Sequence, residues 1–208
     1  MTLSALTDRS SRIRLSRLSW RGICLCLIVL TLSACVGWKA SKSKRYDLKN
    51  TVFSIYVPAG WYSAPLNAKR TLTLTKDGED IQRVLIRKRL HEDAFEHIEK
   101  SSSLDQLPQV LLEKFIADTK VTMPMDTLEV LSHGPALIAG KDGFQLDLAF
   151  RSSEGVRFRE RIYGMASPLA FYTIEYRAPA LYYFDRDVDE FDEIVAGLQI
   201  RTWRWERD

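Results

Sequence analysis

Two glutamates, Glu160 and Glu175, could place a pair of carboxyl groups side by side. Glu160 alternates with the apolar residues Phe158 and Ile162, and Glu175 alternates with Thr173. If the two strands pair through the turn between them, both carboxyl groups lie on one sheet face, because alternate residues share a face. Two such groups among apolar residues can have pKa values raised enough for general acid–base chemistry. A register shift of one residue would separate them, and we favour the alternative that each acid pairs with an arginine across strands or faces solvent.

The opposite face of the first of these strands holds three arginines, Arg157, Arg159 and Arg161. Together with Tyr172 and Tyr176 of the following strand they form the candidate binding patch for a protein partner or an anionic ligand. Arginine and tyrosine are enriched among the residues that dominate binding energies. The alternative, an ordinary solvated sheet face, is the one that we favour on composition alone.

The last part of the chain, residues 201–207, repeats this combination of arginine and aromatic residues. Trp203 and Trp205 share one face if the segment is extended. They either cover an edge of the hydrophobic core, which we favour, or form an edge that binds a partner or contacts a membrane.

The histidines predict no metal site. His91 and His97 are six residues apart, whereas the zinc motif of helical metalloproteases needs two histidines four residues apart on one helical face. His133 is the only other histidine. The sequence has neither a Gly-x-Ser-x-Gly elbow nor a Gly-x-x-x-x-Gly-Lys loop. A Ser-His-Asp arrangement needs only neighbours in space and stays open, but no cofactor and no catalytic residue is predicted.

One cysteine, Cys35, stands in a context that predicts a covalent modification. Five arginines and an apolar run, residues 23–32, precede the sequence Leu-Ser-Ala-Cys that ends at Cys35. A basic stretch, an apolar core and small residues make a secretory signal, and the run is too short to span a bilayer core of about 30 Å. The four residues resemble the lipobox of bacterial lipoproteins. The resemblance implies that the signal peptide, residues 1–34, is removed and that the Cys35 thiol is acylated. An ordinary signal peptide or a signal anchor is the alternative.

Removal of the signal peptide changes the charge of the chain. The formal net charge of the full sequence is +3, but residues 1–35 hold five arginines and one aspartate, so 25 basic and 26 acidic residues remain. Nucleic-acid binding normally shows a basic excess, and we therefore predict no nucleic-acid partner. Cys24 and Cys26 leave with the signal peptide, so the mature domain has no thiol for a disulfide or a cysteine metal site.

The remaining sequence predicts a tether and one domain. Residues 35–47 are short, polar and basic, and we interpret them as the lipidated cysteine followed by an extended tether that reaches at most about 40 Å. Residues 48–208 match the length of a single domain. Within it, Trp61 and Phe144 are predicted core residues. Apolar alternation predicts strands at 52–57, 71–75, 81–89, 128–138, 143–151, 156–165 and 169–176, and helical periodicity predicts helices at 107–120 and 187–198. This order indicates an α+β fold, a single antiparallel meander sheet packed between helices.

Several segments resemble the PsbP-like fold. They are the stretch from Phe53 to Trp61, the pair Gly143-Phe144, the late aromatic hairpin and the ending at 191–200. With the lipobox, the sequence is similar to the DcrB-like bacterial envelope lipoproteins over residues 48–202. The resemblance implies an α/β/α sandwich and carries over no catalytic residue, because proteins of this fold are mostly known as non-enzymatic assembly or accessory proteins.

The sequence therefore predicts a lipid-anchored envelope protein on the periplasmic face that binds a protein partner without being an enzyme. The alternative is a carrier or sensor of a small apolar or anionic ligand, and an acid–base enzyme using Glu160 or Glu175 comes third. Val36 follows Cys35 where an aspartate would retain an enteric-type lipoprotein at the inner membrane. We therefore expect the outer membrane rather than the inner one.

Overall fold

The computed structural model describes residues 37–48, 53–64, 72–123 and 128–200. Cys35, Trp203 and Trp205 lie outside these ranges, so the predictions on lipidation and on the two tryptophans remain predictions. In the described ranges, no helix combines the length and the apolar character needed to cross a membrane.

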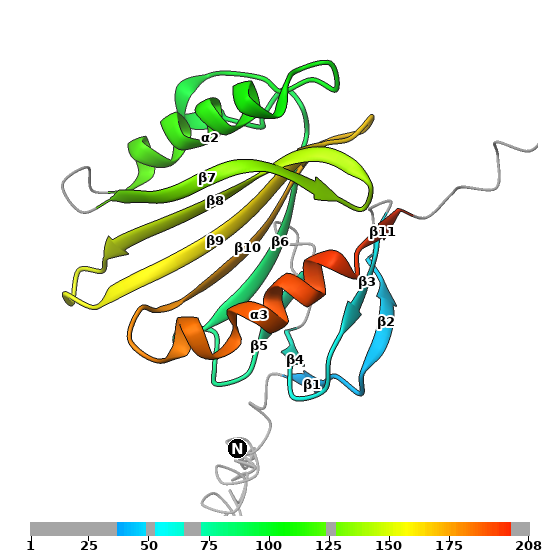
Figure 1. Cartoon of the computed structure of the whole chain (residues 1–208), viewed down its shortest axis with the longest axis vertical. Helices are drawn as coiled ribbons and strands as arrows, with labels where there is room; N and C mark the ends of the chain where they lie inside the picture. Colours follow the sequence, from blue (N-terminus) through cyan, green and yellow to red (C-terminus); the bar gives the residue numbers. More distant parts are fainter. Residues whose placement is uncertain (1–36, 49–52, 65–71, 124–127, 201–208) are drawn as a thin grey trace, which may run out of the picture. The chain divides into compact units, whose positions relative to one another are not determined.

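Most of the strand residues in the described ranges belong to one antiparallel sheet, which Figure 1 shows as a curved layer. Its eight strands follow the spatial order β1, β4, β5, β6, β10, β9, β8, β7. Their bounds are β1 (Lys39–Ala40), β4 (Tyr62–Ser63), β5 (Leu72–Thr75), β6 (Arg83–Arg89), β10 (Phe171–Pro179), β9 (Arg157–Ala166), β8 (Lys141–Arg151) and β7 (Glu129–Ile138). Because β7 to β10 are consecutive neighbours, the second half of the chain is a simple meander, as the sequence predicts.

A smaller sheet joins the two ends of the domain. Its three strands are β2 (Lys44–Asp47), β3 (Phe53–Val57) and β11 (Gln199–Ile200), with β3 in the centre. We expected a single sheet, and this second one is the main departure from the expectation. Its edge strands come from the segment interpreted as a tether and from the residues after the last helix, neither of which has an apolar alternation of its own.

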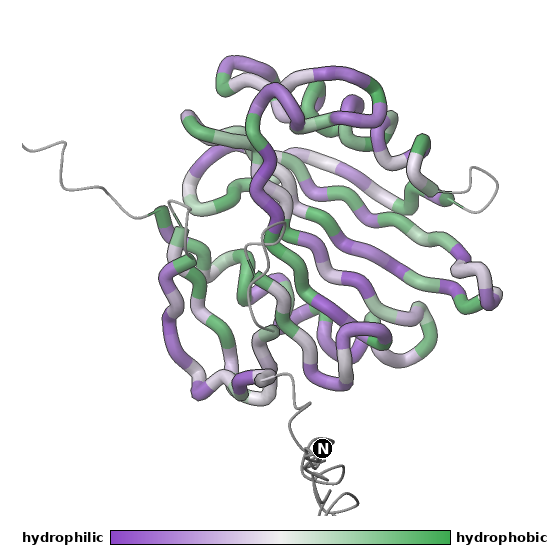
Figure 2. Tube along the Cα trace, turned by 180° about the vertical axis from the view of Figure 1, so that it is seen from behind, coloured by the Kyte–Doolittle hydropathy of each residue, from purple (hydrophilic) through white to green (hydrophobic). Residues whose placement is uncertain are grey.

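The two α-helices cover opposite faces of the large sheet. Helix α2 (Pro108–Thr122) packs its buried side chains in a cluster with Phe171, whereas helix α3 (Tyr183–Ala196) packs in a cluster with Tyr172 and Tyr176. Odd and even residues of a strand point to opposite faces. The fold is therefore the α/β/α sandwich that the resemblance implied, with a short 3₁₀ helix, η1 (Glu96–Ile98), beside α2. Figure 2 shows the alternation of polar and apolar residues along the strands.

Both predicted core residues are buried. Trp61 is 0% exposed and packs in the cluster on the α3 side, and Phe144 is 1% exposed in the cluster on the α2 side. Phe144 lies directly over Gly164, where a Cβ atom would come within 2.3 Å of its ring. The glycine therefore makes room for the aromatic side chain on the neighbouring strand.

The interpretation of residues 36–47 as an extended tether is wrong from Lys39 onward. Lys39 and Ala40 pair with Ser63 and Tyr62, and the four residues of β2 pair with β3. The buried Ser41 fixes the connection between β1 and β2: its N–H donates to the carbonyl of Trp61 over 2.7 Å, and its hydroxyl donates to the carbonyl of Val57 over 3.0 Å. The lysines of this segment suggested a solvated linker. Lysines are also expected on edge strands, where a charge discourages pairing with another chain.

Helix α3 begins four residues earlier than the sequence predicts. Its first residue is Tyr183 rather than Asp187. Asp187 and Glu190 have the spacing of a capping box, but both carboxylates bind side chains of the β5–β6 region instead. The residue before the helix, Tyr182, has a positive φ of 72° and makes no side-chain cap.

Candidate functional site

Glu160 and Glu175 lie on the same face of the sheet, the one that α2 partly covers. Glu175 is paired in register with Ile162, and Glu160 with Arg177, so the two acids are diagonal neighbours on β9 and β10. Each is bound by an arginine: Arg177 Nη2 lies 2.9 Å from Glu160 Oε2, and Arg87 Nε lies 3.1 Å from Glu175 Oε2. The expected cross-strand pairing with arginines is therefore confirmed, although the arginines come from β10 and β6.

The residues of these two ion pairs line a cleft, which we call the charged cleft. It has a volume of about 590 Å³ and lies between helix α2 and the sheet. Its titratable lining residues are Arg87, Lys88, Arg89, Asp93, Glu96, His97, Asp118, Glu160, Glu175 and Arg177. Cations and anions are mixed throughout, so the cleft has no strong preference for a ligand of one sign.

Glu160 is the residue of the charged cleft with the most perturbed protonation. Burial raises the pKa of its carboxyl group above the ordinary value of 4.5; Arg177 lowers it and Glu175 raises it further. Such a shift is typical of catalytic acids, but structural ion pairs produce it as well. The carboxylate of Glu160 is already bound by Arg177, and the carboxylate of Glu175 accepts from Thr173 Oγ1 at 2.7 Å as well as from Arg87. Neither is presented to a substrate as a free acid or base.

The histidines have other partners. His91 Nδ1 lies 2.7 Å from Ser102 Oγ, and its Nε2 lies 2.9 Å from the carbonyl of Ser167. The hydrogen bonds of His91 thus go to a hydroxyl and a backbone carbonyl, which leaves no carboxylate to complete a Ser-His-Asp arrangement there. His97 Nδ1 lies 3.3 Å from Asp118 at the rim of the charged cleft. No group of three possible metal ligands was found among the residues that the structure describes.

The candidate binding patch of arginines and tyrosines is only partly exposed. Tyr172 and Tyr176 share the face of Arg161, as alternation predicts, but they are 1% and 0% exposed because α3 and the small sheet cover that face. Burial raises the pKa of Tyr172 to about 12, as expected for a phenol in an apolar environment. The prediction that both tyrosines contribute to an exposed patch is wrong, because the sequence does not reveal which face the last helix covers.

The three arginines of β9 differ in exposure along the strand. Arg161 binds both oxygens of Asp147 at 2.8 and 2.9 Å and also Asp192 at 2.6 Å, so it fastens α3 to the sheet. Arg159 pairs with Asp185 on α3 at 2.7 Å. Arg157 is half exposed, and its ion pair with Glu129 is also on the surface. None of the three pairs with Glu160 or Glu175, which point to the other face of the sheet.

Arg157 and Arg159 line a shallow groove, which we call the Leu181 groove. It has a volume of about 660 Å³ and is lined otherwise by Leu131, Val156, Pro179, Ala180 and Leu181. Three of these side chains are apolar and exposed: Leu131 at 39%, Val156 at 44% and Leu181 at 88%. Contiguous apolar exposure beside charged residues marks interaction sites on soluble proteins. The sequence indicated the two arginines but not the loop that brings Leu181 beside them.

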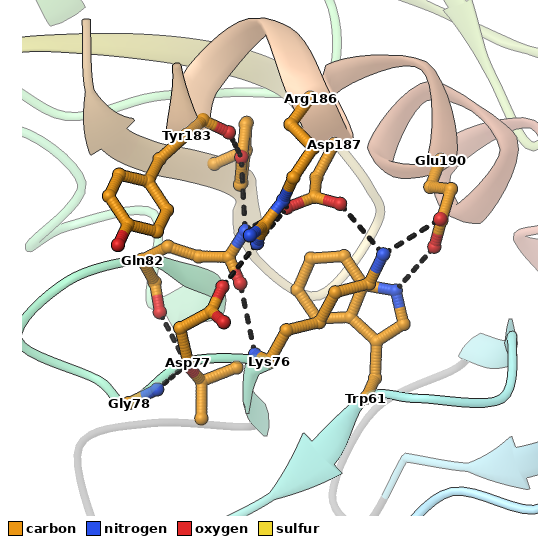
Figure 3. A network of polar contacts seen from close by, with 11 residues as sticks. Trp61, Lys76, Asp77, Gly78, Gln82, Tyr183, Arg186, Asp187 and Glu190 are labelled. Atoms are coloured by element: carbon orange, nitrogen blue, oxygen red, sulfur yellow. Dashed lines mark hydrogen bonds and ion pairs between the residues drawn. The ribbon is translucent and has the colours of Figure 1, made fainter. Parts of the chain in front are cut away.

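A second cluster of charges, shown in Figure 3, is structural. Lys76, at the end of β5, lies 2.7 Å from both Asp187 and Glu190 on α3. Gln82 and Arg186 also donate to the buried carboxylate of Asp187. Burial alone would raise the pKa of Asp187, but these donors outweigh it and hold the pKa below the ordinary value of 3.8. The network joins the first half of the large sheet to the helix that closes the domain.

We expect Asp187→Asn to lower the free energy of unfolding by about 2–3 kcal/mol at pH 7, because an amide removes the buried counter-charge that Lys76 and Arg186 share and leaves each with one less buried acid. A carboxylate with a lowered pKa stabilises the fold above its unfolded value, and this stabilisation is lost as the pH falls through the folded value. The difference between wild type and variant should therefore shrink when urea unfolding is repeated below pH 3.8. Asp189→Asn, an exposed change on the same helix, is the control. An equal difference at both pH values would contradict the assignment.

Comparison with known proteins concerns the fold. No family model matches the sequence, and no curated protein is significantly similar to it. The structure is similar to cyanobacterial PsbP (CyanoP) from Synechocystis sp. PCC 6803, with a TM-score of 0.56, 10% sequence identity, and coverage of 76% of this chain and 91% of that chain. At this identity the match shows the fold alone, which is the α+β fold of PsbP.

Two further structures are more distant. The Ran-binding protein Mog1p of Saccharomyces cerevisiae matches with a TM-score of 0.48 and 10% identity over 76% of this chain and 94% of its own. LpqN, involved in cell envelope biogenesis of Mycobacterium tuberculosis, matches with a TM-score of 0.43 and 11% identity over 78% of this chain and 87% of its own. Neither adds to the fold assignment.

Proposed function

We propose that the protein is a lipid-anchored envelope protein of the DcrB-like kind that binds a protein partner and has no enzymatic activity of its own. The lipobox ending at Cys35 supports the anchor, and Val36 supports the outer membrane as the site of anchoring. The PsbP-like fold agrees with the family resemblance of the sequence. The observation that carries the binding role is the Leu181 groove, where exposed apolar side chains lie beside two arginines.

The charged cleft supports an enzyme less well. Its two buried acids are each neutralised by an arginine, and its histidine is held by Asp118. Ion pairs of this kind hold strands together, whereas a catalytic acid must reach the proton that it transfers.

The charged cleft favours the alternative function, a carrier or sensor, only for a polar ligand. Pockets for small molecules are mostly apolar and bury most of the ligand. The charged cleft is instead half-open and lined by opposite charges. The charged side chains of the cleft could bind a ligand only if their existing ion pairs were first separated. We therefore rank this function second.

The test of the binding role uses exposed residues of the Leu181 groove. The double variant Arg157→Glu, Leu181→Asp should weaken binding of the partner about tenfold or more. A tenfold loss of affinity corresponds to about 1.4 kcal/mol. Truncating a single residue at the centre of an interface can cost about 2 kcal/mol or more. Arg159 is left unchanged because its guanidinium stacks on the buried Phe184 at 4.1 Å and its loss would disturb the core. The partner is first identified by crosslinking in intact cells from a photoreactive residue at position 181, and its affinity for each variant is then measured.

The control makes the same change of charge and apolarity elsewhere. Lys100 and Leu104 are exposed and are absent from the lining of the Leu181 groove, so Lys100→Glu, Leu104→Asp should leave binding unchanged. Both variants should melt within a few degrees of wild type, since surface changes cost little. A Leu181 groove variant that folds and binds as tightly as wild type would refute the proposed interface.

A further inference from the structure

The folded domain begins almost immediately after the predicted lipid. Lys39 is already paired with Ser63 in the sheet, and Ser41 is fixed by two hydrogen bonds. Cys35 and Lys39 are four residue steps apart, which spans at most about 14 Å when fully extended. The headgroup region on each side of a bilayer is itself about 5–8 Å thick. A chain anchored at Cys35 therefore has no room to hold the domain away from the membrane.

The residues that follow the anchor have the composition of a membrane-contacting surface. Trp38 and Tyr62 are 37% and 43% exposed. The register places Tyr62 opposite Ala40, two residues from Trp38, so both rings project from the same side of the β1–β4 pair. Tryptophan and tyrosine favour the interface between water and lipid, where their rings have both an apolar and a polar environment.

Basic residues are frequent in the segment that contains Trp38. Lys39, Lys42, Lys44 and Arg45 are all exposed, and Asp47 is the one acid among residues 37–48. Although the mature chain has a formal charge near zero, this end of the domain is therefore locally positive. Lysine and arginine near a membrane are attracted by anionic lipid headgroups, and the attraction falls off within a Debye length of the surface.

We propose that the edge of the large sheet at β1, with Trp38, Lys39, Lys42, Lys44 and Tyr62, lies flat on the anionic lipid surface to which the chain is anchored. This membrane edge deepens the proposed function, since it rests on acylation of Cys35. It replaces the picture of a domain on a flexible tether by one held in a fixed orientation.

The orientation has a consequence for the Leu181 groove. In the sheet order, β1 is one edge, and β9 and β7, which contribute Arg157 and Leu131, are five and seven strands away. With neighbouring strands about 4.8 Å apart, this places the groove about 24–34 Å along the sheet from the membrane edge. The Leu181 groove is thus held clear of the bilayer and open to a partner.

The experiment measures which end of the sheet is near lipid. The mature chain has no thiol besides Cys35, so a single cysteine can carry a fluorophore. Ser43→Cys marks the membrane edge, and Ser132→Cys on β7 marks the opposite edge; both serines are exposed. The full-length protein, processed and acylated in bacteria, is reconstituted into phosphatidylethanolamine vesicles containing one quarter phosphatidylglycerol and headgroup-nitroxide lipid. We expect the label at 43 to be quenched several-fold more strongly than the label at 132, and equal quenching would overturn the proposal.

Charge reversal tests the basic residues. Lys39→Glu, Lys42→Glu, Lys44→Glu should reduce quenching of the label at 43 by about half, and low salt should enlarge the difference from wild type. The control, Lys100→Glu, Lys120→Glu, Lys141→Glu, has the same net charge on exposed residues outside the membrane edge and should leave quenching unchanged. Equal quenching of wild type and the Lys39, Lys42, Lys44 variant would overturn the role of the basic residues. So would quenching of the wild type in pure phosphatidylcholine vesicles that equals its quenching in the anionic vesicles.

The intact mass of each sample shows whether Cys35 is acylated, and this distinguishes a failure of the membrane edge from a failure of the proposed function. If Cys35 carries no acyl group, the lipid-anchored function fails and the membrane edge with it. If Cys35 is acylated and the two labels are quenched alike, the membrane edge alone is wrong. Partner binding through the Leu181 groove is not involved in either measurement.

Discussion

Replacing Trp61 with alanine is expected to lower the free energy of unfolding by about 3–5 kcal/mol, the range for removing a large buried aromatic side chain. Trp61 is 0% exposed, and its ring meets Tyr176 edge-on with the centroids 6.5 Å apart. Its indole N–H donates to Glu190 on α3 over 3.0 Å. Alanine therefore leaves both a cavity between sheet and helix and an acid that has lost one of its donors.

Two controls separate these contributions in urea unfolding at pH 7. Trp61→Phe keeps an aromatic ring but loses the N–H. It should lower the free energy of unfolding less than Trp61→Ala does, because the phenyl ring fills most of the cavity that alanine leaves. Trp38→Ala removes an exposed indole and should change the free energy of unfolding by less than about 0.5 kcal/mol. If Trp61→Ala cost no more than Trp38→Ala, the position of Trp61 in the core would be wrong.

The sequence was sufficient to predict both α-helices and six of the eight strands of the large sheet, all except β1 and β4. Strict alternation in 143–151 and the aromatic hairpin that follows locate β8, β9 and β10, since a pattern of period two is compatible with one buried face per strand. The same alternation correctly placed Glu160 and Glu175 on a common face, because the short turn between the strands keeps their register.

The identity of the covering elements could not be predicted. Alternation states that Arg161 and Tyr176 share a face but not that α3 lies on it. The ion pairs of Arg161 with Asp147 and Asp192 show why the face accepts arginine: acids on β8 and α3 neutralise it. The loop that exposes Leu181 beside Arg157 depends on how β10 passes into α3, and a local pattern does not record that geometry.

The interpretation of residues 36–47 was wrong for a related reason. An edge strand that carries lysines has the same composition as a solvated linker, because only its backbone is used in pairing. Ser41 gave no signal either, since the two hydrogen bonds that it donates go to the backbone carbonyl groups of residues 57 and 61. Whether such a segment forms a strand depends on pairing partners that are distant in the sequence.

Cys35→Ser is expected to block lipidation and to leave an unprocessed or soluble species. Acylation through the sulfur of a lipobox cysteine needs a thiol, and the serine hydroxyl does not replace it, so the leader should remain attached and no acyl chain should be added. Because the domain is already fixed from Lys39 onward, the loss of lipid should leave its melting temperature unchanged.

The measurements are detergent partitioning of whole-cell extracts and the intact mass of the purified protein. Cys24→Ser and Cys26→Ser, the same change at the two cysteines of the leader, should be processed and anchored as wild type is. Equal partitioning and equal processing of wild type and Cys35→Ser would refute the lipid anchor, and with it the orientation of the Leu181 groove relative to the membrane.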